Sequence, residues 1–173
     1  EIGLMRQAIA NHRSGRTALA TKNIAQLIAA HPNDPYYREL QGQILLESRQ
    51  YDAAIIAYGM AAQFAPLNAL ILAGYGRSLL ATNTKISNAK ALDILQKAHG
   101  LDNRGARILR DIGIAFARSG KQGQAVLAIA ERYALLGDVK NAVLQAKRAV
   151  GILPSGSTSW QRAQDILGSV ETP

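Results

Sequence analysis

The sequence predicts an all-α protein built from stacked pairs of antiparallel helices, and three observations support this prediction. Small residues and prolines recur at one fixed spacing, as in the pairs Ala20 and Ala54, and Pro32 and Pro66. Ala and Leu, which have high helix propensity, are abundant, whereas aromatic residues make up only 5% of the chain. The long alternation of β-branched and aromatic residues that strands need is missing from the sequence. Together these features indicate a repeated unit of two helices and a turn.

The spacing of these pairs is that of the tetratricopeptide repeat (TPR), whose period is about 34 residues. Small residues are expected at positions 8, 20 and 27 of each unit, where its two helices cross closely, and a proline at position 32 ends the second helix. Residues 1–34 form a first unit, and residues 35–68 form a second unit that fits best. The second unit carries at these four positions Gly42, Ala54, Ala61 and Pro66.

The third unit, residues 69–105, is longer than the period. Gly76 fits its position 8, but Ala91 and Ala98, the next small residues, each come three positions later than the period would place them. We place the three extra residues in the polar stretch 82–88, because a longer turn accommodates an insertion at little cost.

The C-terminal part departs further from the period. Ala125 and Ala142 both fit position 20, yet they are separated by only half a period. The fourth unit, residues 106–136, and a fifth, residues 123–156, are therefore expected to share a helix. Residues 157–170 are expected to form a helix that caps the apolar face of the last unit. The whole chain then forms one TPR-like α-α superhelix of about ten helices.

Local signals place several helix ends. Asp34 is expected to cap the helix that begins at Pro35, a residue tolerated at the first helical position. The turn within the second unit is expected at residues 50–52. Thr158 and Gln161 have the spacing of a capping box at the start of the last helix. The apolar cover that this helix provides is expected from Trp160, Ile166 and Leu167.

Composition limits the classes of function. The net charge is +8, and the basic residues are dispersed without interleaved aromatic residues, so we do not expect a nucleic-acid surface. The absence of cysteine excludes disulfides and zinc–thiolate sites. No apolar run is long enough to cross a bilayer, so no transmembrane segment is expected. The chain begins at Glu1 rather than Met, which leads us to expect a fragment of a longer or processed protein.

Catalytic motifs are missing from the sequence. His12, His31 and His99 do not pair with each other or with a carboxylate at the spacing of metal ligands. There is no His-Glu-x-x-His, Gly-x-Ser-x-Gly, P-loop or dinucleotide-binding pattern. We expect no catalytic residue, no cofactor and no metal within this chain.

A binding surface remains as the expected functional feature. In a superhelix of this type the first helix of each unit lines the concave face. The residues predicted to bind a partner there are Arg77, Arg107, Arg110, Arg118, Tyr36, Glu39 and Gln43. The arginines either pair locally with Asp111 or Glu131, or meet carboxylates of a partner peptide or a tethered domain.

Four segments carry a resemblance to a known family: YYRELQGQILLES at 36–48, AAI at 53–55, AERYALLGD at 130–138, and LPSGS followed by WQRAQDIL at 153–167. They resemble the C-terminal repeat segment of bacterial M48-family zinc metallopeptidases, which are relatives of the periplasmic β-barrel assembly-enhancing protease. The half-repeat step and the tryptophan-containing tail are its most specific parts.

The resemblance implies a periplasmic protein whose missing N-terminal domain holds the zinc ion. It also implies that the repeats are non-catalytic and pack on that protease domain. They would recruit or orient unfolded outer-membrane proteins, or engage the machinery that assembles them.

Three alternatives remain beside this one. The first is a free-standing TPR adaptor that assembles protein complexes. The second is a chaperone-type clamp for C-terminal peptides. We discount it because the clamp needs Lys and Asn at fixed positions where this chain has Met5, Ile9, Glu39 and Gln43. Nucleic-acid binding is the weakest alternative, and strong salt dependence would reveal it.

Overall fold

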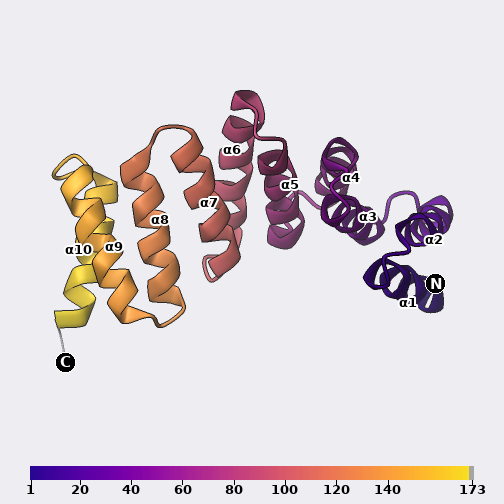
Figure 1. Ribbon diagram of the computed structural model, residues 1–173, viewed down its shortest axis with the longest axis horizontal. Coiled ribbons are helices and arrows are strands. Elements are labelled where there is room, and N and C mark those ends of the chain that lie inside the picture. The colour runs from indigo at the N-terminus through magenta and orange to yellow at the C-terminus, as the bar shows by residue number, and fades with distance from the viewer. Residues whose placement is uncertain (172–173) are drawn as a thin grey trace. The chain divides into compact units, whose positions relative to one another are not determined.

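The computed structural model describes residues 1–171, in which ten α-helices and no strand are found (Figure 1). This confirms the predicted all-α fold. The helices are α1 (Ile2–Arg13), α2 (Thr17–Ala30), α3 (Pro35–Glu47), α4 (Tyr51–Phe64), α5 (Ala69–Thr82), α6 (Lys85–Leu101), α7 (Ala106–Arg118), α8 (Gln122–Leu135), α9 (Val139–Ile152) and α10 (Thr158–Glu171).

The helices fall into two compact units, and each is described here by itself. Unit 1 comprises residues 1–83 with α1–α5, and unit 2 begins at Thr84 and contains α6–α10. Successive helices pack against each other within each unit, as helical hairpins joined by short turns require. The division into repeats at residues 34, 68, 105, 136 and 156 stays a prediction. None of the helices within residues 1–171 has the length and apolarity needed to cross a membrane.

The predicted cap of α3 is confirmed. One carboxylate oxygen of Asp34 accepts a hydrogen bond from the backbone N–H of Tyr36 at 2.8 Å, and Pro35 begins the helix. The predicted turn at residues 50–52 is wrong, because α4 already begins at Tyr51. The turn lies just before it, where Arg49 adopts a left-handed backbone conformation with a φ of 60°.

The core of unit 1 contains a tyrosine held between two glycines. Tyr58 on α4 is only 4% exposed. A Cβ atom added to Gly42 on α3 would lie 2.6 Å from the Tyr58 ring, and one added to Gly74 on α5 would lie 2.2 Å from it. Burial, together with the charge of Glu39, raises the pKa of the Tyr58 hydroxyl. The small residue predicted at position 42 is therefore needed for packing, and Gly74 is a second such residue that the repeat pattern did not indicate.

The three extra residues of the third repeat lengthen a helix rather than a turn. Only Asn83 and Thr84 separate α5 from α6, and α6 has 17 residues where α2, α4 and α5 have 14. The longer turn predicted at residues 82–88 is therefore wrong. The physical reason is a capping box. The Ser87 hydroxyl accepts a hydrogen bond from the backbone N–H of Thr84, and the Thr84 hydroxyl accepts one from the backbone N–H of Ser87. These bonds stabilise an early start of α6.

In unit 2, α8 packs against both α7 and α9, and α10 covers α8 and α9 (Figure 1). Trp160 and Ile166 of α10 pack on a cluster that includes Val126, Leu127 and Leu153, so the predicted cap helix is present. The residue predicted to cap the start of this helix, Thr158, is wrong by one position. The hydroxyl of Ser157, not of Thr158, accepts a hydrogen bond from the backbone N–H three residues later.

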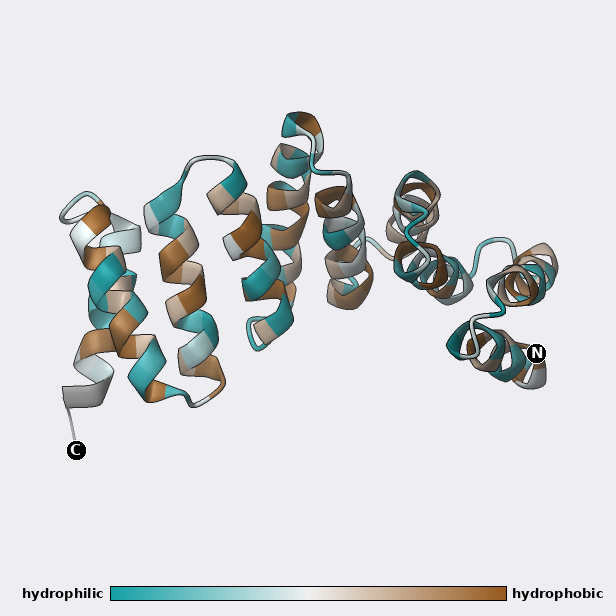
Figure 2. Ribbon diagram, in the orientation of Figure 1, coloured by the Kyte–Doolittle hydropathy of each residue, from teal (hydrophilic) through white to brown (hydrophobic). Residues whose placement is uncertain are grey.

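Helix α7 shows why unit 2 has an inner and an outer surface. Ile108, Leu109, Ile112 and Ala115 of α7 are buried, whereas Arg107 and Arg110 are exposed. Figure 2 shows apolar and polar bands alternating along α7 and α8. This amphipathic pattern directs one face of each helix toward its neighbours and leaves the other face for solvent or a partner.

Candidate functional site

A pocket of about 310 Å³ in unit 2 is the candidate site, and four helices form its walls. Leu109, Ile112 and Phe116 contribute from α7, where they are three and four residues apart and so share one face. Leu127 on α8 adds to this apolar floor. Helix α6 and the cap helix α10 supply the remaining walls, so the pocket depends on the cap as well as on the repeats.

Polar residues also line this pocket. The amides of Gln96 on α6 and Gln124 on α8 line the pocket, and so do Ser159 and His99. Among the residues that the structure describes, Nδ1 of His99 is a buried atom without a hydrogen-bond partner. A pocket with an apolar floor and a few polar groups at its edge is typical of a binding site for a small molecule or a side chain.

An ion pair closes one edge of this pocket. Glu131 on α8 pairs with Arg162 on α10, and the Glu131 side chain is 18% exposed while that of Arg162 is 50% exposed. Burial raises the pKa of the Glu131 carboxyl, and the nearby Arg162 guanidinium opposes this increase. The pair therefore joins the cap helix to α8 and leaves one side of the guanidinium in solvent.

The three predicted arginines of unit 2 have different surroundings. Arg110 donates two hydrogen bonds, of 3.0 and 2.9 Å, to one carboxylate oxygen of Asp111, which is only 1% exposed. Arg118 donates to the side-chain oxygen of Asn88 at 3.3 Å. Arg107 is exposed on the first turn of α7. Arg110 thus pairs locally with Asp111, which is one of the two alternatives expected from the sequence. Glu131, the other expected local partner, pairs with Arg162 instead.

The other four predicted residues lie in unit 1. Tyr36 is 59% exposed at the start of α3, and Gln43 donates a hydrogen bond to Glu47 at 3.0 Å. Glu39 is half-buried, and burial raises the pKa of its carboxyl. Arg77 on α5 is half-buried, and its charge partly opposes the increase that burial causes in the pKa of the Tyr58 hydroxyl. The predicted residues are thus divided between the two units, and their common concave face stays a prediction.

Two histidine–carboxylate pairs in unit 1 were not expected from the sequence. Nε2 of His12 lies 2.7 Å from Glu47, and Nε2 of His31 lies 2.6 Å from Glu1. Each pair joins residues at least 30 positions apart, so local spacing could not indicate it. Residues 1–171 bring together no group of three or more His, Cys, Asp or Glu side chains that could hold a metal ion.

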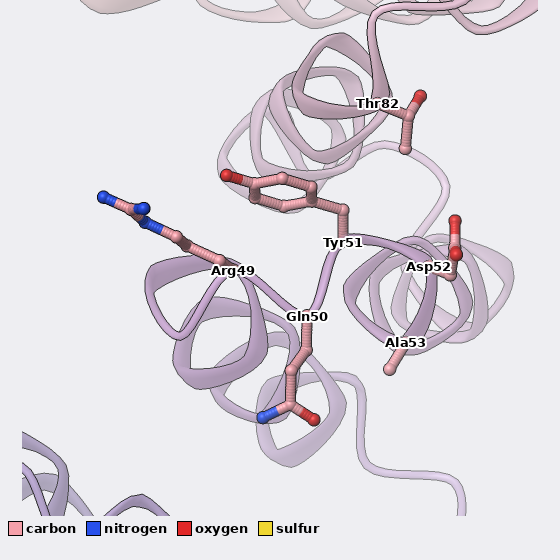
Figure 3. A pocket seen from close by; sticks show the side chains of 6 residues that line it. All are labelled: Arg49, Gln50, Tyr51, Asp52, Ala53 and Thr82. Atoms are coloured by element: carbon pink, nitrogen blue, oxygen red, sulfur yellow. The ribbon is translucent and has the colours of Figure 1, made fainter.

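A second pocket, of about 470 Å³, lies in unit 1 at the turn between α3 and α4 (Figure 3). Arg49 lines it from this turn, Tyr51 and Asp52 line it from the start of α4, and Thr82 lines it from the end of α5. Figure 3 shows the guanidinium of Arg49 and the hydroxyl of Tyr51 directed to the same side of the pocket, with Asp52 on the other side. Sequence reasoning missed this pocket, since no pattern indicated that Thr82 lies near this turn.

Comparisons with known structures bear on the fold. No protein-family model matches the sequence, and no curated protein is similar to it. A thermophilic TPR protein of Thermus thermophilus superposes with a TM-score of 0.61 at 17% identity, covering 95% of this chain and 97% of its own. MamA from Desulfovibrio magneticus RS-1 gives 0.71 at 15% identity, covering 98% and 96%. Another crystal structure of MamA gives 0.70 at 15% identity, covering 94% and 95%.

These similarities define the class of protein by its fold. The chain is an all-helical TPR-like α-α superhelix, as the repeat period predicted. Identities of this size show the fold alone, so the role of the chain is argued from its own residues.

Proposed function

We propose that this chain is a non-catalytic protein-interaction domain that binds a peptide segment of a partner protein through the unit 2 pocket. The observation that supports this is a pocket lined both by the apolar residues Leu109, Ile112, Phe116 and Leu127 and by several polar side chains. A pocket of about 310 Å³ has room for one large apolar side chain and part of the neighbouring backbone. The amides and the imidazole that line the pocket can pair with the peptide groups on either side of that anchor.

The charge of unit 2 favours an acidic partner. From residue 84 onward the sequence has 13 Lys and Arg against 7 Asp and Glu, a net charge of +6, whereas residues 1–83 have 7 against 5, a net charge of +2. A peptide with carboxylates on both sides of its apolar anchor would be attracted to this unit. Arg107 and Arg162 are exposed residues on helices that form the pocket, and Arg162 also lines it.

The test uses a glycine that lines the pocket. Gly100 on α6 has nothing within 4 Å of the position where its Cβ would lie, so Gly100→Trp can place an indole at the pocket without a backbone clash. Gly151 on α9 is equally open and exposed, and Gly151→Trp is the matched control. The probe is a labelled peptide of sequence acetyl-DDLFDD-amide, and its affinity is measured by fluorescence anisotropy.

We expect Gly100→Trp to weaken binding of this peptide by about tenfold or more, and Gly151→Trp to leave it unchanged. Peptides of sequence KKLFKK and DDSSDD should bind weakly to the unaltered protein, because each lacks one of the two features. Equal affinity of both tryptophan variants would contradict the proposal. Equal affinity for DDSSDD would show that charge alone is responsible and would also contradict it.

We further propose that the domain belongs to a periplasmic M48-type zinc metallopeptidase. The support is the resemblance of residues 36–48, 53–55, 130–138 and 153–167. In that setting the repeats recruit or orient unfolded outer-membrane proteins or their assembly machinery, and they pack on the protease domain. The resemblance implies that this protease domain would hold the zinc ion. A His-Glu-x-x-His motif encoded upstream of Glu1 is the expected finding. A start codon directly ahead of the repeats would support the free-standing adaptor instead.

A further inference from the structure

We propose that the unit 1 pocket at the turn between α3 and α4 binds a single carboxylate of a partner through Arg49 and Tyr51. This site is separate from the unit 2 pocket and is independent of the function proposed above. Three observations meet at Arg49: its backbone conformation, its place at the pocket, and its charge.

The backbone conformation of Arg49 is one that glycine would adopt more easily. Its φ is 60°, in the left-handed region that side chains with a Cβ rarely occupy. The corresponding short turns at Gly15, Gly120 and Gly137 have glycine with φ values of 73°, 72° and 74°. Gly15 lies one full period before Arg49. Arg49 adopts a strained backbone conformation where the equivalent turns have glycine. This indicates a functional role for the Arg49 side chain.

The geometry of the pocket fits a carboxylate. The Arg49 guanidinium and the Tyr51 hydroxyl are directed to the same side, where both can donate hydrogen bonds to one anionic group (Figure 3). Arg49 is exposed and Tyr51 is half-buried, so the ligand can reach both from solvent.

Asp52 and the apolar walls restrict the ligand further. The Asp52 carboxylate lies on the opposite side of the pocket and opposes a second negative charge, which disfavours phosphate dianions (Figure 3). The Tyr51 ring offers an apolar surface on the side of the pocket to which the cation is directed (Figure 3). The ligand is therefore a monoanionic carboxylate on an apolar body. Both a peptide C-terminus and a glutamate side chain present such a group.

The experiment titrates the full chain with three small probes and follows the Arg49 side-chain N–H and the backbone amides of residues 50–53 by NMR. N-acetyl-leucine carries the carboxylate of a C-terminus, and N-acetyl-glutamate α-amide carries that of a side chain. N-acetyl-leucinamide has no carboxylate. We expect saturable shifts, on the order of millimolar affinity, with one or both acids and none with the amide. Equal shifts with the amide would overturn the proposal.

The decisive variant is Arg49→Gly, since it removes the cation and relieves the backbone. We expect it to raise the denaturation midpoint while lowering the affinity for the acid by about tenfold or more. Arg49→Lys, which keeps both the charge and the strain, should retain part of the binding. Arg16→Gly is the control, because Arg16 lies at the matching turn of the first repeat with a φ of −86°. It should leave binding unchanged without stabilising the protein. Unaltered binding by Arg49→Gly, or a lower midpoint, would contradict the proposal.

Discussion

The two glycines around Tyr58 allow a sharp test of how the repeats pack. Replacing Gly74 by Ala adds a Cβ atom 2.2 Å from the Tyr58 ring, closer than real Cβ contacts come. The ring has little room to move away from α5, because Gly42 on α3 lies at the opposite edge of the ring, where a Cβ would be only 2.6 Å from it. One methyl group must therefore displace a helix or force the tyrosine out of its place.

The expected magnitude is the balance of two opposing terms. Ala in place of Gly within a helix stabilises by about 0.5–1 kcal/mol. Overpacking of a tight core costs about 1–3 kcal/mol, and the upper half of this range applies because the ring is confined on two sides. The net effect of Gly74→Ala is then a loss of roughly 1–2.5 kcal/mol in the free energy of unfolding.

Gly59→Ala is the matched control, because Gly59 follows Tyr58 on α4 and its Cβ would lie 3.6 Å from the Tyr75 ring, an ordinary contact distance. This variant should be more stable than the unaltered protein by about 0.5–1 kcal/mol. Urea denaturation followed by far-ultraviolet circular dichroism measures both variants, with each unit fitted as its own transition. The reasoning is refuted if Gly74→Ala proves as stable as Gly59→Ala.

Three further predictions concern unit 2. Arg110→Glu should lower the free energy of unfolding by about 1–3 kcal/mol in chemical denaturation, because it replaces the ion pair with the buried Asp111 by two like charges. Arg107→Glu should change it by less than about 0.5 kcal/mol. Similar losses in the two variants would argue against a structural role for Arg110. Burial raises the pKa of the Glu131 carboxyl above its ordinary 4.5, so the folded state holds this proton longer than the unfolded state. The contribution of Glu131 to the free energy of unfolding should therefore decrease as pH rises from 4.5 through the raised pKa. In denaturation curves at several pH values, Glu131→Gln should remove this dependence on pH. A dependence that persists in the variant must come from other groups. Trp160→Ala should lower the free energy of unfolding by about 2–4 kcal/mol, since α10 would no longer cover α8. An unchanged thermal midpoint would show that the cap is dispensable.

The regular part of the fold was predictable because it follows from local chemistry repeated at a fixed spacing. Asp34 and Pro35 indicate the start of α3 by themselves, and Gly42 indicates a close helix crossing. The expectation that glycine at position 8 marks a close helix crossing does not hold in every repeat. A Cβ atom on Gly113, the equivalent residue of the fourth repeat, would lie 3.5 Å from its nearest neighbour, so glycine is not required at that position.

The turns were less predictable, because more than one local solution exists. Gln50–Asp52 resembles a turn in composition, but the chain turns one step earlier, since Arg49 accepts the left-handed conformation. The extra residues after α5 could enter a loop or a helix, and the capping box between Thr84 and Ser87 favours the helix.

Neither pocket was predictable from the sequence, since each is lined by helices that are distant in the chain. The repeat pattern predicts binding residues only in the first helix of each repeat. The unit 2 pocket instead uses α6 and the cap helix α10, which a repeat rule does not treat as binding elements. The ion pair between Glu131 and Arg162 joins α8 to that cap. It was not predictable either, because the repeat rule does not indicate which residues the cap helix contacts.

Mapping the acetyl-DDLFDD-amide peptide onto the protein by two-dimensional NMR tests the proposed binding function without any substitution. The peptide should shift the amide signals of residues that line the unit 2 pocket, with the largest changes at Gln96, Gly100 and Gln124. The same titration with the DDSSDD peptide should leave these signals in place. Shifts confined to exposed basic residues elsewhere, or no saturable shift at all, would contradict peptide binding at this pocket.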